Sequence, residues 1–322
     1  MKRTRIIVFM VILNCLSSLT AFAQHTQESC SRIDITDHYP GLKGLFNHPR
    51  DQGNVGLCYA YPAADILSIL VGRPVSAIAV ALNDMSYYRD NFWYRNFLDA
   101  NTAYPKGGLA GEAFAASQAL GFCLESELQS NVGESTGLLD AFEAIHEAIF
   151  VAKYGGEFNP DPMILKSYFN TFSKSSKEHL LGVAKNNRDK SFIEVLLALK
   201  NSQCTQRVRV SKNFGWQNLD VKEMSSVVIS KIDKILESKL PLETSFETTF
   251  LKGFTRDSLH SMLLIGREWK GDQCRYRFRN SWGTGCQFYS PTLQPYCDGE
   301  KGQLLISETE ILENAISIGF AQ

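Results

Sequence analysis

Cys58 is the residue in this 322-residue chain best placed to act as a nucleophile. It follows a glycine-containing turn and begins an alanine-rich apolar stretch, which predicts a buried helix over residues 58–71. A thiol attacks carbonyl groups as the thiolate, and a helix N-terminus lowers the thiol pKa by its partial positive charge. Gln52, in the turn before it, can direct its amide at a developing oxyanion. A lone cysteine at a helix start is more often structural, so the assignment depends on partners elsewhere.

Those partners occur in the last third of the chain. His260 lies at the head of an apolar strand predicted over residues 259–269, where it can accept the thiol proton and later protonate a leaving amine. Asn280 follows a strand predicted over residues 275–279 and can hold the imidazole in one tautomer. Trp282 beside it can shield that hydrogen bond from water. Each residue alone is weak evidence, but together they predict a nucleophile, a base and an orienting amide.

Four segments in this order resemble the papain family of cysteine peptidases. The family's nucleophile turn appears as residues 52–60 (QGNVGLCYA), its histidine strand as residues 260–266 (HSMLLIG) and its asparagine turn as residues 279–286 (RNSWGTGC). Gly107 and Gly108 look like the family's paired glycines, whose backbone binds the substrate chain. The resemblance implies that the nucleophile, base, orienting residue and oxyanion donor are Cys58, His260, Asn280 and Gln52.

The resemblance implies a cysteine endopeptidase whose partners are peptide or protein substrates, with a protein inhibitor as a further partner. It implies an α+β, papain-like fold, with the site in the cleft between a helical and a β-rich subdomain. A helical first half and a strand-rich last third agree with this. The expected substrate-binding residues are Gly107, Gly108, Leu109, Ser261 and Trp282. Because Leu109, Ala110 and Ser261 are apolar or small, we expect a bulky apolar side chain two residues upstream of the cut.

The chain departs from the family pattern at several points. Val55 stands where the family has a cysteine, Tyr59 replaces the tryptophan after the nucleophile, and Cys286 replaces the second tryptophan of the asparagine turn. None of these changes removes a catalytic group. The spacing from Cys58 to His260 exceeds the roughly 130 to 150 residues of the family, which predicts an insertion at about 124–209. Residues 155–190 within it are polar and are interpreted as insertion or loop material.

The N-terminus predicts export. Residues 1–23 combine basic residues, a short apolar run and the small-residue pattern Ala21-Phe22-Ala23, which is typical of a signal peptide. The catalytic domain then covers residues 24–322, in a secreted or periplasmic protein without a stable membrane anchor. Lipoprotein processing at Cys15 is the alternative. Too few residues separate the cleavage site from Cys58 for an N-terminal inhibitory domain, so we expect none.

The number of cysteines and the net charge limit which disulfides, metals and partners are expected. Of eight cysteines, removal of Cys15 leaves an odd number, and a free Cys58 would leave six for disulfides, whose pairing the sequence does not fix. No C-x-x-C spacing occurs, so we expect no metal and no cofactor. A net charge of -1 gives no reason to expect nucleic acid as a partner. The basic run at residues 275–279 reads as a solvated strand face.

Two other functions stay open at this point. The first is an inactive papain-fold protein that binds peptides without cleaving them, which the intact catalytic set disfavours. The second is a thiol amidase that acts on cell-wall peptides, which the sequence does not exclude because the specificity pockets lie largely outside the matched motifs.

Overall fold

The structure is a computed structural model that describes residues 25–53, 55–87, 107–130, 137–172, 176–223, 225–253 and 258–322. The predicted signal peptide and the alternative at Cys15 lie outside the described residues. The α-helices are α2 (Lys43–Asn47), α3 (Ala60–Val71), α4 (Ala77–Tyr87), α6 (Ala110–Leu120), α7 (Gly137–Tyr154), α8 (Pro162–Thr171), α9 (Lys177–Asn186), α10 (Phe192–Gln203), α11 (Ser225–Glu237), α12 (Thr248–Lys252) and α13 (Glu308–Asn314). The strands are β1 (Ile33–Asp34), β2 (Trp216–Leu219), β3 (Leu242–Glu247), β4 (Leu259–Lys270), β5 (Gln273–Arg279), β6 (Cys297–Asp298), β7 (Gln303–Ser307) and β8 (Ala315–Ala321). Short 3-10 helices are η1 (Ile35–His38), η2 (Pro40–Leu42), η3 (Cys286–Phe288) and η4 (Gln294–Tyr296).

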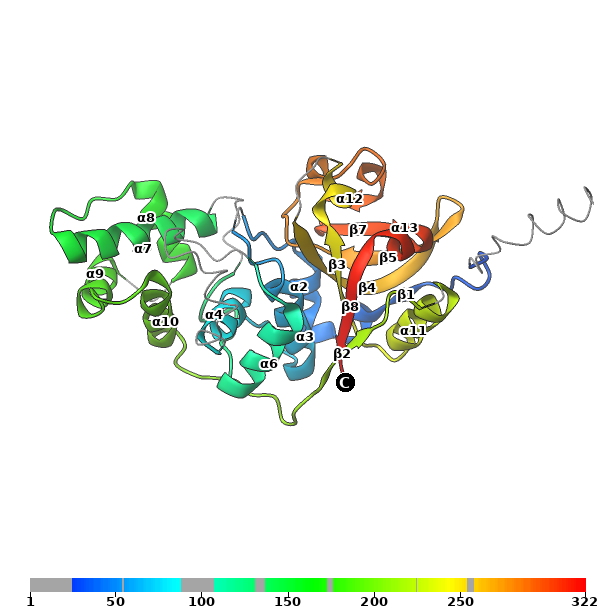
Figure 1. The fold of residues 1–322 in the computed structure, drawn as a ribbon, viewed down its shortest axis with the longest axis horizontal. Helices are drawn as coiled ribbons and strands as arrows, with labels where there is room; N and C mark the ends of the chain where they lie inside the picture. The colour runs from blue at the N-terminus through cyan, green and yellow to red at the C-terminus, as the bar shows by residue number, and fades with distance from the viewer. Residues whose placement is uncertain are drawn as a thin grey trace, which may run out of the picture.

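These elements form three parts along the long axis of the molecule (Figure 1). Helices α7–α10 occupy one end, α2, α3, α4 and α6 the middle, and the sheet with α11, α12 and α13 the other end. The predicted α+β class, with a helical and a β-rich subdomain, is confirmed. Within the described residues, no helix combines the length and the apolar character needed to span a bilayer.

The sheet is antiparallel throughout, and its described strands run in the order β2-β8-β3-β4-β5-β7-β6, with β1 attached to β4. The predicted strands at 259–269 and 275–279 correspond to β4 and β5. Strand β3 ends at Glu247, and the chain turns directly into α12. The β4–β5 hairpin matters most for the site, because His260 is near its start and Asn280 follows its end.

Helix α3 lies in the centre of the molecule, between helices α4 and α6 and the sheet (Figure 1). Its residues from Ala60 to Ile69 are all buried, which agrees with the apolar sequence that predicted a buried helix. It ends at Gly72, whose φ of 69° is the left-handed conformation that glycine adopts at little cost. Pro62 falls in the first turn, where no backbone N–H is required.

Helices α7–α10 occupy the segment expected to be an insertion. Residues 155–190, interpreted from the sequence as loop material, instead contain α8 and α9. Side chains of Asp161 and Ser176 cap these two helices, so their polar residues mark helix starts. The Cys123–Cys204 disulfide joins the two ends of this region, at a Cα–Cα distance of 5.5 Å.

Two other disulfides, Cys30–Cys274 and Cys286–Cys297, complete the pairing of the six expected cysteines. The first ties the segment before β1 to β5, and the second closes the loop after the asparagine turn. Of the cysteines that the structure describes, Cys58 is the one with a free thiol.

The contact between β1 and β4 yields a test of the fold. Gly266 is buried and pairs with Asp34, and a Cβ at position 266 would overlap the backbone oxygen of Ile33. We therefore expect Gly266→Ala to lower the free energy of unfolding by about 1 to 3 kcal/mol, because the backbone has to move apart. Urea denaturation of the purified protein with its disulfides intact measures this.

Gly182→Ala is the matched control, because Gly182 lies inside α9 and a Cβ there meets no atom within 4 Å. This variant should be unchanged or gain up to about 1 kcal/mol of stability. Equal unfolding midpoints for the two variants would contradict the packing described for β1 and β4.

Candidate active site

Cys58 lies directly before the start of α3, whose N-cap is Tyr59. Its side chain is half-buried, and Sγ faces the carbonyl oxygen of Leu259 at 3.9 Å. The backbone N–H groups of Ser261 and Tyr59 also hydrogen-bond to the sulfur. Leu259 and Ser261 are the residues on either side of His260, so the fold brings the predicted nucleophile to the strand that carries the predicted base.

The orientation of the Asn280 amide can be derived from its partners. Oδ1 accepts a hydrogen bond from the Ser281 N–H at 2.7 Å, and Nδ2 donates to the Tyr289 hydroxyl. Oδ1 is therefore the atom that faces His260 Nε2, at 2.6 Å. Because a carbonyl oxygen only accepts, Nε2 must carry a proton, which leaves Nδ1 of the neutral ring as an acceptor. This is the tautomer that a general base needs.

Two aromatic rings cover this hydrogen bond. Trp282 packs on the imidazole of His260 with ring centroids 4.1 Å apart, and Tyr289 packs on Trp282 at 5.4 Å. Lys252 Nζ lies 4.4 Å from the centre of the Trp282 ring. His260 and Asn280 are each 3% exposed, so the hydrogen bond between them is sheltered from water.

The side-chain amide of Gln52 is also fixed by hydrogen bonds at both ends. Its Oε1 accepts a hydrogen bond from the Ser281 hydroxyl at 2.6 Å, and its Nε2 donates to the Val55 carbonyl at 2.9 Å. One Nε2 hydrogen remains for another acceptor. The backbone N–H of Gln52 also donates to the Ser281 carbonyl at 2.9 Å, so the turn that carries Gln52 and the turn that carries Asn280 are joined directly.

The paired glycines lie beside the nucleophile. A Cβ at position 108 would come within 2.6 Å of the Tyr59 ring, so only glycine allows this approach. Leu109, at the start of α6, is 60% exposed, whereas Ser261 is 4% exposed and its hydroxyl donates to Glu243 at 2.6 Å. Leu109 therefore lies on an open surface, and Ser261 belongs to a buried polar contact that the sequence did not predict.

Burial determines the charge of the nucleophile and base. It raises the pKa of the Cys58 thiol, although the N–H groups of Ser261 and Tyr59 act in the opposite direction. It lowers the pKa of His260 to about 4, against the hydrogen bond that the ring donates to Asn280, and the nearby charge of Lys252 lowers it further. The helix start therefore does not give the low thiol pKa expected from the sequence. At neutral pH the resting pair is an uncharged thiol and an uncharged imidazole.

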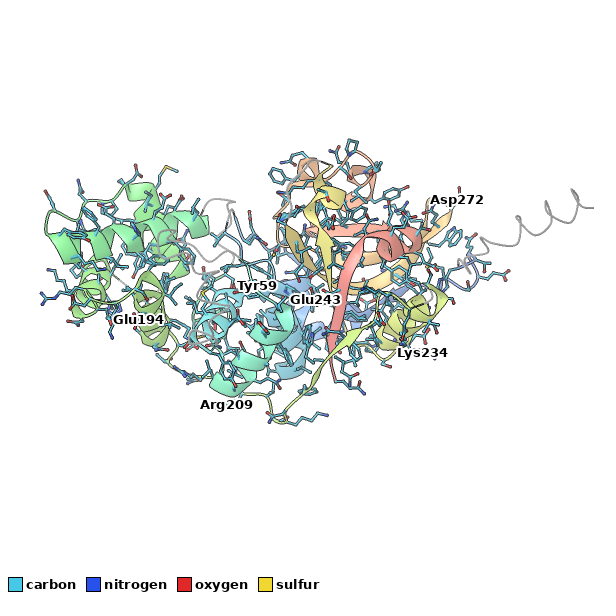
Figure 2. All side chains as sticks on the ribbon, in the orientation of Figure 1. Tyr59, Glu194, Arg209, Lys234, Glu243 and Asp272 are labelled. Carbon is cyan, nitrogen blue, oxygen red and sulfur yellow. A yellow bond between two sulfur atoms is a disulfide. The ribbon has the colours of Figure 1, made fainter. Side chains whose placement is uncertain are left out.

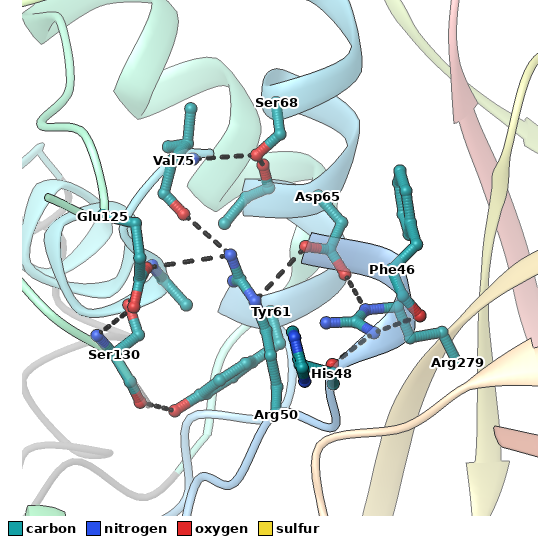
Figure 3. A network of polar contacts seen from close by, with 12 residues as sticks. Phe46, His48, Arg50, Tyr61, Asp65, Ser68, Val75, Glu125, Ser130 and Arg279 are labelled. Carbon is teal, nitrogen blue, oxygen red and sulfur yellow. Dashed lines mark hydrogen bonds and ion pairs between the residues drawn. The ribbon is translucent and has the colours of Figure 1, made fainter. Parts of the chain in front are cut away.

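A buried carboxylate behind the site holds two arginines (Figure 3). Asp65, on α3, accepts a hydrogen bond from Arg279 Nε at 2.9 Å and lies 3.4 Å from Arg50 Nε. Arg279 also donates to the carbonyl oxygens of Phe46 and His48. Arg279 is the residue before Asn280, and the Arg50 carbonyl accepts from the Gly283 N–H at 2.8 Å. The network therefore attaches the turns that carry Gln52 and Asn280 to the helix that begins after Cys58.

This network corrects one prediction from the sequence. The basic run at 275–279 was expected to be a solvated face, but Arg275 and Arg279 are 5% and 3% exposed. Asp65, Tyr289 and Glu243 were not predicted either. Their partners lie on other elements, and no local pattern marks them.

Among known proteins, only solved structures are similar to this chain, and the similarity covers most of its length. No family model matches it, and neither does any curated protein sequence. Its structure is similar to digestive procathepsin L 3 of the Tenebrio molitor larval midgut, at 12% identity and a TM-score of 0.41 over 90% of this chain and 69% of that one. It is also similar to the ragweed pollen cysteine protease Amb a 11 in its proform, at 13% identity and a TM-score of 0.44, over 90% of this chain and 58% of that one. A procathepsin B from Trypanosoma congolense is similar at 13% identity and a TM-score of 0.44, over 90% of this chain and 75% of that one.

The charge state of the pair can be tested by alkylation with iodoacetamide, which is uncharged and reacts with thiolate. Because the thiol pKa is raised and the imidazole is neutral above a pH of about 4, we expect a low rate near pH 7. The rate should increase only as pH rises past the ordinary thiol pKa of about 8.5. Mass spectrometry that follows Cys58 over a pH series measures it. A rate that is already high and constant between about pH 5 and 8 would indicate a thiolate–imidazolium pair instead.

The network behind the site can be tested with Asp65→Asn. This change keeps the size of the side chain but leaves two buried guanidinium groups without their shared carboxylate. Loss of one partner of a buried ion pair costs about 3 to 5 kcal/mol, so the denaturation midpoint should fall strongly.

Asp189→Asn is the matched control, since Asp189 forms a surface pair with Arg188 at 3.6 Å and its side chain is 89% exposed. This change should alter the free energy of unfolding by less than about 0.5 kcal/mol. If the two variants unfold at the same denaturant concentration, the network is not the constraint inferred from its geometry.

Proposed function

We propose that this protein is a papain-like cysteine endopeptidase that hydrolyses peptide bonds through Cys58, His260 and Asn280. The observation that carries the proposal is the fixed amide of Asn280, which leaves the acceptor nitrogen of His260 free while the sulfur of Cys58 lies against the residues on both sides of that histidine. This set suits nucleophilic catalysis by a thiol, because the base is oriented by a third group.

The first half of the reaction is acylation. Nδ1 of His260 takes the proton from Cys58 as sulfur attacks the carbonyl carbon of the substrate, and the imidazolium that forms keeps its Nε2–H bond to Asn280. The free Nε2 hydrogen of Gln52 is the proposed donor to the oxyanion. When the tetrahedral intermediate collapses, the imidazolium gives its proton to the leaving amine and a thioester remains on Cys58.

The second half releases the acyl group. A water molecule gives a proton to His260 Nδ1 as it attacks the thioester carbonyl. When the acid product leaves, the imidazolium gives that proton to the Cys58 thiolate. Trp282 and Tyr289 exclude water from the His260–Asn280 bond throughout, which keeps the ring in one orientation.

We further propose that the protein is exported and works in an oxidising compartment. The three disulfides among the described residues support this, because such bonds persist where thiols are not kept reduced. A signal peptide at residues 1–23 remains part of the proposal.

Mutation of the catalytic set is the direct test. Cys58→Ala and His260→Ala should each abolish hydrolysis of a diverse peptide library, because nucleophile and base act as a unit. Gln52→Ala should reduce kcat roughly 100- to 1,000-fold, as expected for loss of one oxyanion donor. Asn280→Ala should be milder than loss of the base, since the amide orients the ring and transfers no proton.

His146→Ala is the matched control for His260→Ala, because His146 is exposed on α7. It should retain full activity. Hydrolysis by purified Cys58→Ala protein would refute the assignment. A protein that neither reacts with a thiol-directed epoxide inhibitor nor cleaves a peptide would favour the binding protein, and cleavage of cell-wall peptides alone would favour the amidase.

A further inference from the structure

Glu243, on β3, is a buried carboxyl group that the proposed mechanism does not use. It is 5% exposed, and its Oε1 accepts hydrogen bonds from the hydroxyls of Ser245 and Ser261, each at 2.6 Å. It interacts electrostatically with Cys58 and so lies close to the nucleophile. Figure 2 marks it beside Tyr59, where the helices meet the sheet.

The sheet register places these groups on one face. Ser245 on β3 pairs with Ser261 on β4 and with Ser317 on β8, so three serines lie side by side across three strands. We call them the serine strip. Glu243 precedes Ser245 by two residues and points to the same face, since side chains alternate along a strand. Its partner on β8 is Gly319.

That face is turned toward the helical part of the molecule. A Cβ at Gly319 would come within 2.6 Å of the Trp216 ring, and a Cβ at Gly111 on α6 within 2.7 Å of the same ring. Trp216 therefore lies between β8 and α6 and borders the face that carries Glu243. The residue before α6, Leu109, is exposed beside the paired glycines. The serine strip and Glu243 thus lie next to Cys58, opposite the start of α6.

Glu243 differs from other buried carboxylates of this chain. Asp65 pairs with Arg50 and Arg279, and Asp233, buried to a similar degree, pairs with Arg267. Among the described residues, no basic side chain pairs with Glu243, and both serine hydroxyls bind the same oxygen, Oε1. Burial raises the pKa of Glu243 to about 7. With respect to the residues that the structure describes, one oxygen of this carboxyl group therefore accepts no hydrogen bond, and no cation pairs with the group.

We propose that Glu243 and the serine strip form a subsite beside Cys58 that binds the basic side chain, lysine or arginine, of a peptide substrate. The inference rests on the proposed function and adds a substrate class to it. A guanidinium or ammonium group has only donors, which suits the vacant oxygen of Glu243 and the acceptor oxygens of the serines. The apolar preference expected from Leu109, Ala110 and Ser261 is the competing outcome of the test.

The test uses matched peptides in which one residue, at each position around the cut in turn, is arginine, lysine, citrulline or norleucine. We expect the wild type to prefer arginine or lysine at one position by roughly 10- to 100-fold in kcat/KM, the effect of a hydrogen-bonded charge. Glu243→Gln keeps the size of the side chain and should lose most of this preference while its norleucine peptide is still cleaved. Glu313→Gln, on the exposed surface of α13, is the control with the same change in charge.

A second measurement keeps the inference testable if Glu243→Gln does not fold. Cys58→Ala protein is titrated with the arginine and citrulline peptides by calorimetry, and tighter binding of arginine is expected. Equal binding of the two peptides, an unchanged preference in Glu243→Gln, or a wild type that prefers norleucine would each overturn the subsite. If the wild type cleaves no peptide, the proposed function fails, while the titration still decides the subsite.

Discussion

The site depends on one carboxylate. Asp65 projects from the helix that follows Cys58 and holds Arg50 and Arg279 in the interior, each 3% exposed. A buried guanidinium is costly unless it is paired and its N–H groups are satisfied, so the two chain segments that carry these arginines have little freedom to be elsewhere. One segment leads to Gln52 and the other to Asn280. A structural ion network thereby aligns the groups proposed to be catalytic, which are far apart in sequence.

Hydrogen bonds around this network fix the two turns and then their side-chain amides. The backbone joins the turns through Gln52 N–H to Ser281 O, and each amide is then held by one backbone group and one side-chain hydroxyl. A hydroxyl can serve either end of an amide, but a backbone carbonyl only accepts and a backbone N–H only donates. Neither amide can therefore flip without loss of its backbone hydrogen bond, so the direction of its dipole is set before any substrate arrives. The aromatic cover of Trp282 and Tyr289 adds little direction of its own, but it keeps water from competing for the His260–Asn280 bond.

The sequence predicted those features that local pattern determines. The apolar run after Cys58 predicted α3, and the motifs around Cys58, His260 and Asn280 predicted residues that the fold does bring together. Features that depend on long-range pairing were missed. Arg279 belongs to an alternating basic pattern that is typical of a surface strand. Only the position of Asp65, on another element, shows that it is buried. The contacts of Glu243 likewise depend on two serines that the strand register brings beside it, which the sequence does not show. Residues 155–190 were misread because capped amphipathic helices on a small lobe are nearly as polar as loops.

The balance of charge explains how these parts cooperate. The full charges of the network lie behind the site, where they stabilise the frame, while the pKa of Cys58 is raised and that of His260 lowered by burial. Proton transfer from thiol to imidazole therefore creates a new ion pair in a poorly solvated place, and it would be unfavourable without dipoles that are already aligned. Glu243 opposes the thiolate with its own charge. A cationic substrate group bound to Glu243 would cancel that opposition, so binding of the right side chain would favour the step that begins the chemistry.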